Sequence, residues 1–379
     1  MKLKLIALAI SSSVALTACG GGGGGSSGSG ATPSSSSPST STPTTSTPST
    51  STPTTSTPTT STPTTPGTDP NALQTTVPAP TYAPNSIELS AFTELNQIRT
   101  SYGVGQVAQN GLLDTAAQNH ANYINARLQV GDSSAVGHAE NSANAGFTGT
   151  LPADRIAYAK YAASQVGEDL TSIEATDGVP SDPGIVSIDT LMSGPYHRFS
   201  MLDPNRDVGY AHVTARLPNQ TMGIQNTIVT NFGVAQGVQQ QLPAKGWVGV
   251  WPADGATGVL YSSFGESPNP IPTNNGQCAG YPVSVQVRPD ATLTTTTFTL
   301  VEAASGAAVN VQLSTQATDA NPAYARANAA YIMPYQPLKL STKYTAHFVG
   351  SQSGTAIDKT WSFTTRADNV KAIYFCNPS

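Results

Sequence analysis

The chain has 379 residues, enough for two or three domains. Charged side chains make up 10% of it, well below the roughly 25% of ordinary soluble domains, and the formal net charge is −5. No stretch concentrates lysine and arginine, so the composition argues against nucleic acid as a partner, because phosphate binding requires a basic surface.

Residues 1–19 have the pattern of a lipoprotein signal peptide. Lys2 and Lys4 precede an apolar run that is too short to span a membrane as a helix. The run ends in "LTAC", which resembles the bacterial lipobox. The resemblance implies that Cys19 carries lipid, including palmitate, and anchors the protein in the outer membrane or at the cell surface. The alternative is an ordinary secretory signal with an incidental cysteine.

Residues 20–75 are typical of a disordered stalk. A glycine and serine run gives way to repeats of the type "STPTT" without apolar periodicity. Such a segment cannot bury enough apolar surface to offset its ordering entropy. Its prolines favour polyproline II, which at about 3.1 Å per residue would hold the next domain on the order of 100 Å from a membrane.

A mixed α/β domain is predicted to follow at residues 86–242. Apolar residues at helical spacing predict two helices, over 86–102 and 110–128. His120 lies beside the apolar stripe of the second helix, and we interpret it as a hydrogen-bonded structural residue. Two strands end the domain, over 207–217 and 226–236.

A third helix, over residues 185–192, places Asp189 close to its apolar face. A core-facing carboxylate without a partner costs several kcal/mol. The helix should close at Gly194 and Pro195, because glycine accepts a left-handed cap and proline cannot continue the helix. We expect the chain to turn there, so that His197 emerges beside Asp189.

Residues 245–379 consist of short β-rich runs separated by turns, which predict a β-sandwich. Only "NPAYARANAAYI", residues 321–332, is a candidate helix here. The stretches "WPADGATGVLYSSFGESPNP", "GYPVSV", "LSTKYTAHF" and "KTWSFTT" resemble a bacterial Ig-like domain. The resemblance implies a spacer or an adhesive module, and fold alone does not give function.

The chain has three cysteines, so few disulfide pairings are possible. With Cys19 lipidated, Cys278 and Cys376 remain, and an oxidising compartment favours a disulfide between them. The alternative is two separate thiols.

Polar clusters in the α/β domain offer a site. "VGHAENSANAGFTG" carries His138 and Glu140, and "QVGEDLTS" carries Glu168. If they converge with Asp189 and His197, one cleft holds two histidines and two or three carboxylates. That set suits zinc or another divalent metal, or an acid–base pair. No HExxH, G-x-S-x-G, P-loop or G-x-G-x-x-G pattern is present.

Residues 88–236 resemble a bacterial member of the CAP superfamily, also called SCP/PR-1-like. "ELNQIR", "LLDTAAQNHANYI", "VGED" and, most specifically, "IDTLMSGPYHRFSMLDPNRDVGY" carry the resemblance. It implies a three-layer α-β-α sandwich with a cavity lined by two histidines and two acids. These fall on His138, Glu168, Asp189 and His197, with Glu140 as an additional candidate ligand.

This sequence also departs from the family. Asp169 stands where the family has asparagine, and the eukaryotic cysteine framework is absent.

The sequence leaves three functions open. The first is a surface-anchored protein whose solvent-reachable cleft binds a divalent metal and an extracellular small molecule, lipid or cell-wall component. The second is a metal- or acid/base-dependent hydrolase, and the third is an adhesive or display scaffold. No nucleophile or oxyanion donor can be located, so whether the protein is an enzyme stays open.

Overall fold

The protein is described by a computed structural model that covers residues 69–175, 182–216, 224–263, 265–274 and 278–367. All of these residues belong to one structural unit. The expected signal peptide with Cys19, nearly all of the expected stalk, and Cys376 lie outside the described residues. Among the described residues, no helix is long and apolar enough to cross a membrane.

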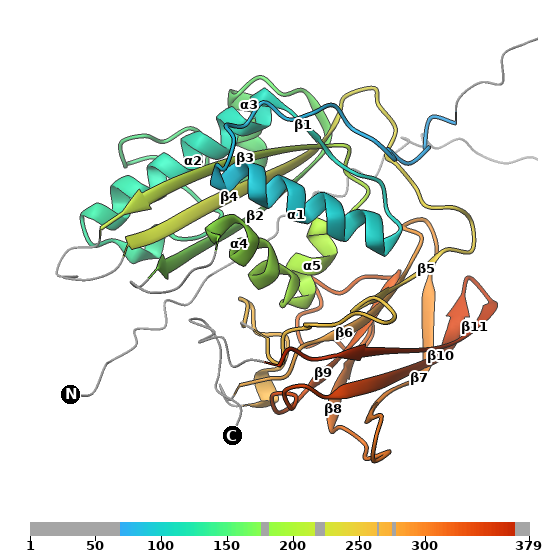
Figure 1. The fold of residues 1–379 in the computed structure, drawn as a ribbon. Coiled ribbons are helices and arrows are strands. Elements are labelled where there is room, and N and C mark those ends of the chain that lie inside the picture. Colours follow the sequence, from blue (N-terminus) through green and yellow to red (C-terminus); the bar gives the residue numbers. More distant parts are fainter. Residues whose placement is uncertain (1–68, 176–181, 217–223, 264, 275–277, 368–379) are drawn as a thin grey trace, which may run out of the picture. The chain divides into compact units, whose positions relative to one another are not determined.

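The first part of the unit, residues 69–242, is called here the α/β region. Its helices are α1 (Ile87–Tyr102), α2 (Gly111–Gln129), α3 (Pro152–Tyr158), α4 (Pro183–Met192) and α5 (Pro195–Met201). Its strands are β1 (Ala108–Gln109), β2 (Ala163–Ala175), β3 (Asp207–Ala215) and β4 (Ile224–Ala235). They form one sheet in the order β1-β3-β4-β2, parallel between β1 and β3 and antiparallel elsewhere (Figure 1).

The two long helices form where their periodicity predicts them. The Ser86 hydroxyl accepts the Leu89 N–H and caps α1, and Gly103 ends that helix with a φ of 84°. At that angle a residue with a Cβ is strained, so glycine is the residue that fits. The Asn110 side chain caps α2 in the same way by accepting the Leu112 N–H.

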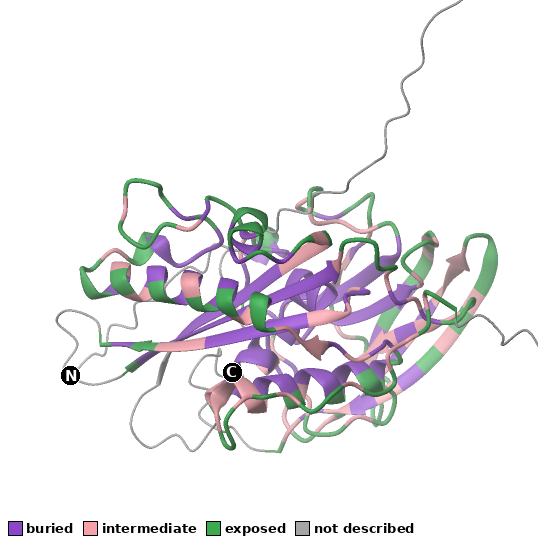
Figure 2. Cartoon of the chain, turned by 90° about the horizontal axis from the view of Figure 1, so that it is seen from above, coloured by how far each residue is buried: buried purple, intermediate pink, exposed green. Residues whose placement is uncertain are grey.

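Helices cover both faces of the sheet. A Cβ on Gly209 of β3 would meet Leu113 and Asp114 of α2, so the face that carries Gly209 looks toward α2. The other face packs in a core shared with α1, α4 and α5. In Figure 2 the strands of this sheet are buried over most of their length, while exposed residues lie on loops and outer helix faces.

Strand register decides where the polar residues of β2 lie. Glu168 is level with Asn231 and Gly209, so it lies on the α2 face. The next residue, Asp169, is level with Thr230 and therefore lies on the opposite face, toward α4 and α5. β2 was not predicted from the sequence.

The second part, residues 245–367, is called here the β region. Its strands are β5 (Val248–Trp251), β6 (Val283–Val287), β7 (Leu293–Glu302), β8 (Val311–Ser314), β9 (Ala329–Pro334), β10 (Lys343–Gln352) and β11 (Thr355–Thr364). They form two sheets, β5-β6-β9-β8 and β11-β10-β7. Val285, Phe298, Ile332, Phe348 and Trp361, drawn from both sheets, pack in one core.

The candidate helix at residues 321–332 is not formed. This stretch contains turns and the start of β9, because Ala330 and Ile332 pair with β6 and are buried there. The Ig-like assignment of the β region stays a prediction.

The segment around Gly194 differs from the expectation in a way that matters for the site. α4 ends at Met192, and Gly194 has an extended conformation, with φ −104° and ψ 128°, instead of a left-handed cap. Pro195 then begins α5, since the first position of a helix needs no N–H partner. His197 therefore lies in α5, the helix that follows α4, and not in an exposed turn. Every residue of α5 is buried.

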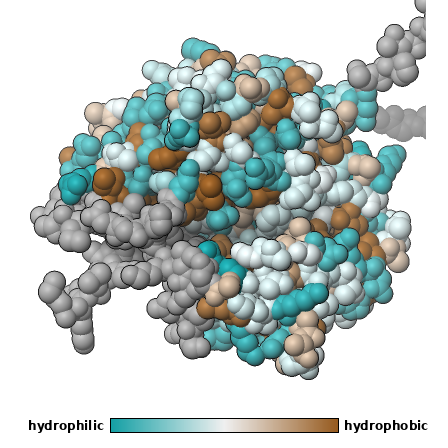
Figure 3. Space-filling model, viewed as in Figure 1, coloured by the Kyte–Doolittle hydropathy of each residue, from teal (hydrophilic) through white to brown (hydrophobic). Residues whose placement is uncertain are grey.

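The surface gives little sign of a large apolar docking face. The most exposed large apolar side chains of the described residues are Val130 and Tyr158, at 67% and 60%. On the face shown in Figure 3, apolar residues lie in small groups among polar ones. We therefore looked for the functional site among the buried polar groups.

Candidate functional site

His138 is fixed by a buried ion cluster on the α2 side of the sheet. Its Nδ1–H donates to Oε1 of Glu168 (2.9 Å). Nη2 of Arg155, in α3, donates to both oxygens of Glu168 (2.6 and 2.8 Å), and Nη1 donates to the carbonyl of His138 (2.9 Å). In its better amide orientation Asn231 also donates to Oε2 of Glu168 (3.0 Å). Arg155 thereby holds the loop of His138 against β2.

His120 and Glu140 belong to the scaffold of this cluster. The two ring nitrogens of His120 face Oε1 of Glu140 (3.0 Å) and the carbonyl of Gly137 (2.8 Å). The other oxygen of Glu140 accepts the N–H of Thr148 (2.7 Å). His120 is thus hydrogen-bonded and structural, as expected. Glu140 is engaged by these groups, and nothing points it toward a ligand.

His197 is held by a carboxylate from the β region. Its Nδ1–H donates to Oε2 of Glu266 (2.6 Å), and the backbone N–H groups of Tyr196 and His197 donate to the same carboxylate (2.9 and 3.2 Å). A Cβ on Gly194 would lie 2.6 Å from Oε2 of Glu266, so the glycine makes room for it. The expected pairing of His197 with Asp189 is therefore corrected: its partner is Glu266.

Asp189 lies in a different environment. It is half-buried in α4; burial and the neighbouring charge of Glu94 raise the pKa of its carboxyl to about 7, and Arg366 opposes this rise. The carboxylates that act on His197 are Glu266 and Asp169.

The reactive feature of the site is a set of unpartnered buried atoms. Nε2 of His138 and Nε2 of His197 are buried without a hydrogen-bond partner. Asp169, also buried, has the Ser200 hydroxyl as its hydrogen-bonding neighbour. The charge of His197 is one of the smaller contributions that lower the pKa of His138. Buried polar atoms without partners are rare in folded proteins and call for an explanation.

The charges of the site tune its groups differently. Burial lowers the pKa of His138 despite the opposing effect of Glu168. Burial also acts to lower the pKa of His197, but Glu266 and Asp169 outweigh it and raise the pKa. For Glu168, burial acts to raise the pKa, yet His120, Arg155 and His138 lower it to about 2.

The pKa of Asp169 shifts in the direction opposite to that of its neighbour Glu168. Burial raises the pKa of Asp169 to about 7, an effect that the nearby His197 and the Ser200 hydroxyl only partly offset. Burial thus acts against ionisation of this carboxyl, while His197 acts in its favour.

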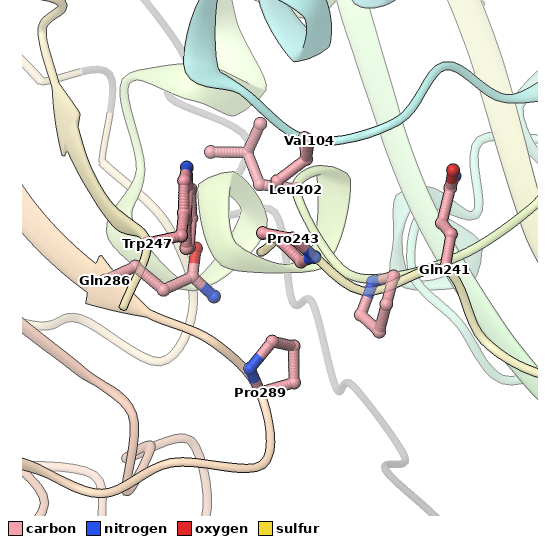
Figure 4. Close-up of a pocket in the computed structure, with 8 residues that line it drawn as sticks. Val104, Leu202, Gln241, Pro243, Trp247, Gln286 and Pro289 are labelled. Carbon is pink, nitrogen blue, oxygen red and sulfur yellow. The ribbon is translucent and has the colours of Figure 1, made fainter. Parts of the chain in front are cut away.

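The sequence predicts a solvent-reachable cleft, but both imidazole rings are buried. His138 is 2% exposed and His197 is 4% exposed. One pocket in the described residues, with an empty volume of about 250 Å³ that includes open solvent, is lined by Val104, Leu202, Pro243, Trp247, Gln286 and Pro289 among others (Figure 4). Neither histidine lines this pocket.

The β region covers α5. The Tyr196 hydroxyl donates to Oδ1 of Asp319 (2.6 Å), and Nη1 of Arg198 donates to the carbonyl of Pro282 (2.8 Å). The ring of His197 is therefore enclosed between β2 of the α/β region and the segment that carries Glu266.

The donor set can be tested against the expected metal. Among the described residues, no group of three or more histidine, cysteine, aspartate or glutamate side chains is arranged to hold a metal ion. Glu168 is occupied by Arg155 and His138, and Glu266 is occupied by α5. The donors that remain are the Nε2 atoms of the two histidines, with the carboxyl of Asp169 near His197. These atom types suit zinc, while the two glutamates are placed to orient the rings.

One known protein family matches the α/β region. Residues 92–226 match the family model described as the cysteine-rich secretory protein family, CAP. The chain contains a CAP domain. The matched residues of the CAP domain include His138, Glu168 and His197 but end before Glu266. No curated protein matches the chain.

Sequence reasoning missed Arg155 and Glu266. Arg155 follows Asp154 in "LPADR", a stretch without a catalytic motif, although an arginine in a chain so poor in charge is itself a signal of a buried ion cluster. Glu266 lies 69 residues from His197, so no local pattern links the two.

Cys278 is disulfide-bonded. The other cysteines, Cys19 and Cys376, lie outside the described residues, so the expected pairing of Cys278 with Cys376 stays a prediction.

Proposed function

We propose that this protein is a surface-anchored binding protein whose CAP domain holds a divalent metal ion, with zinc as the best fit, on the Nε2 atoms of His138 and His197. One observation carries the proposal. Two buried imidazoles each have a carboxylate on Nδ1 and no partner on Nε2, and the charge of His197 acts on the pKa of His138.

The chemistry of the two rings supports a metal. A carboxylate that accepts the Nδ1–H leaves the lone pair of a neutral imidazole on Nε2, and such a carboxylate also raises the basicity of the ring as a ligand. Glu168 and Glu266 have this role. A bound zinc ion supplies Lewis acidity and an open coordination position for a small ligand.

The burial of the site favours a small occupant. A metal ion needs only a local opening to reach atoms that lie beneath the surface, whereas a bulky substrate would require the β region to move away from α5. The two histidines supply two ligands, and the carboxylate that we propose as a third is Asp169, whose charge acts on His197.

The N-terminal sequence supports the cellular location and the partners that we propose. The segment that ends in "LTAC" supports export and lipid anchoring through Cys19 at the outer membrane or cell surface. The proposed partners are therefore the membrane, through the lipid, and an extracellular small molecule, lipid or cell-wall component at the metal site.

Metal titration of the full chain tests the proposal. Metal-free protein should bind one zinc ion per chain in calorimetry, and the double change His138→Gln/His197→Gln should abolish that binding. The matched control is His347→Gln, because His347 is an exposed histidine of β10 far from the proposed ligands in sequence. Circular dichroism checks that each variant is folded. Undiminished binding by the double variant would place the metal elsewhere.

A hydrolase is the second candidate, and Asp169 is the observation that favours it. A carboxyl with a pKa of about 7 beside a histidine is poised for acid–base work near neutral pH. A panel of ester, glycoside and peptide substrates, assayed with and without chelator, tests this function. Turnover that survives chelator and disappears in Asp169→Asn would support acid–base hydrolysis, and absence of turnover on every substrate class would count against it.

A further inference from the structure

We propose that Glu266, which lies beyond the matched CAP residues, is the positioning residue of His197, so that the β region completes a site that the CAP domain alone leaves unfinished. The geometric part of this inference stands on the described contacts. Only its metal readout rests on the proposed function.

One carboxylate satisfies three donors at the start of α5. Oε1 of Glu266 accepts the N–H of Tyr196, and Oε2 accepts both the N–H and the Nδ1–H of His197. The Glu266 side chain is 2% exposed and that of His197 is 5% exposed, so water cannot substitute for either partner. Without the carboxylate, these buried N–H groups would lose their acceptor at a cost comparable to a lost hydrogen bond.

The contact also fixes the tautomer of the ring. An ionised carboxylate only accepts hydrogen bonds, so Nδ1 of His197 must carry a hydrogen. In the neutral ring the lone pair then lies on Nε2, the atom without a partner. Neutral histidine in water favours the opposite tautomer, with hydrogen on Nε2. Glu266 therefore imposes the form that can act as a ligand or base at Nε2.

The segment of Glu266 is built to reach this point. The Ser263 hydroxyl donates to the carbonyl of Ser193 (2.9 Å), between α4 and α5. The N–H of Gly265 donates to the Ser263 hydroxyl (3.2 Å), and Gly265 has a φ of 84°, which favours glycine. Gly194 leaves the space that the carboxylate fills. These contacts hold Glu266 against the start of α5 from both sides of the boundary between the regions.

The two histidines are thus supported in the same way from different parts of the chain. Glu168 supports His138 from β2, inside the CAP match, and Glu266 supports His197 from outside it. A change that moves the β region away from α5 would leave the His138 half intact and release the ring of His197.

The tautomer of His197 gives a test that needs no metal. Metal-free full-length protein is labelled with ¹⁵N-histidine, and long-range ¹H–¹⁵N spectra are recorded at about pH 9, with His197 assigned from His197→Gln. We expect the Nδ1–H form in the wild type and a shift to the Nε2–H form in Glu266→Ala. Glu266→Gln should keep the wild-type form, because its amide oxygen can still accept the Nδ1–H. The control Glu302→Gln, which changes a surface ion pair of the same region, should leave the spectrum unchanged.

A second variant moves the carboxylate without removing it. Gly194→Ala places a methyl group where Oε2 of Glu266 lies, and we expect the same loss of the Nδ1–H form. Gly111→Ala is the matched control, because nothing lies within 4 Å of its added Cβ. An unchanged His197 tautomer in both Glu266→Ala and Gly194→Ala would overturn the inference.

Zinc titration of the same variants separates this inference from the proposed function. Loss of the group that orients a metal-bound histidine typically weakens metal binding about 10–100-fold. We expect a loss in this range for Glu266→Ala and Gly194→Ala and none for the two controls. If the wild type binds no zinc but the tautomer shifts as described, the metal function fails and the positioning role stands. If zinc binds equally to wild type and Glu266→Ala and the tautomer does not move, the positioning role fails and the metal function stands.

Discussion

The buried pair of Arg155 and Glu168 should be the most sensitive point of the CAP domain. Both side chains are 0% exposed, and Nη2 of Arg155 lies 2.6 Å from Oε1 of Glu168. Glu168→Gln keeps the volume but removes the negative charge, which leaves the buried guanidinium with only the more distant carboxylate of Glu140, 3.8 Å from its Nε, as a counter-ion. Removing one member of a buried pair costs about 3–5 kcal/mol.

This cost can be measured as a thermal shift. For a region of about 150–250 residues, 1 kcal/mol corresponds to roughly 2–4 °C in Tm. Glu168→Gln should therefore lower the Tm by roughly 6–20 °C in circular dichroism at pH 7. The control is Asp132→Asn in the pair Arg127–Asp132, whose side chains are 28% and 29% exposed. A surface pair contributes about 0–1 kcal/mol, so its Tm should move by at most a few degrees.

The pH dependence gives a second reading of the same pair. The pKa of Glu168 falls from an ordinary 4.5 to about 2 in the folded protein. A lowered pKa stabilises the fold fully above the unfolded value and loses this effect as pH falls toward the folded value. The Tm difference between wild type and Glu168→Gln should therefore be largest above about pH 5 and shrink between pH 4.5 and pH 2. A Tm within about 2 °C of wild type at pH 7 would refute the assignment of Glu168 as the counter-ion of Arg155.

Three further predictions concern the anchor, the disulfide and the metal. Cys19→Ala should release the protein from membranes, and a variant that still sediments with them after a high-salt wash would contradict lipid anchoring. Non-reducing peptide mapping should join Cys278 to Cys376, and losing this bond should cost roughly 2–5 kcal/mol; a map that pairs Cys278 otherwise would reject the assignment. Zinc affinity should fall as pH drops through the pKa of His197, which Glu266 and Asp169 hold above its ordinary 6.5. An affinity that stays constant from pH 8 to pH 6 would contradict His197 as a ligand.

Periodic elements could be predicted from the sequence because their signals are local. The apolar spacing of α1 and α2 agrees with the structure, as do the strands that became β3 and β4. β2 escaped prediction because Glu168 and Asp169 interrupt the apolar pattern that marks a buried strand. Both carboxylates are buried within β2, so the polar residues of the candidate site also break the apolar pattern that would have revealed the strand.

The helix α5 was missed for a different reason. Gly194 and Pro195 were interpreted as the end of a helix, but the same pair also begins one, since proline is favoured at the first helical position. Local sequence does not distinguish these two uses. The distinction comes from Glu266, which supplies the acceptor for the N–H groups at the start of α5, and its position was not predictable from residues 193–202.

The precision of the site depends on arginines that touch neither histidine ring. Arg99 donates to the carbonyls of Gly105 (2.8 Å) and Met201 (2.6 Å), which ties the end of α5 to α1. Arg198 donates to the carbonyls of Met192 (2.8 Å) and Pro282 (2.8 Å), which ties α5 to the end of α4 and to the β region. Both arginines are fully buried, and a planar guanidinium can satisfy several carbonyls whose directions are fixed. A lysine would keep the charge and lose that geometry, so α5 would be free to shift by an amount that matters for a ligand atom with a bond of about 2 Å. Two of the nine arginines of this chain are thus buried to hold α5, and with it His197, in place.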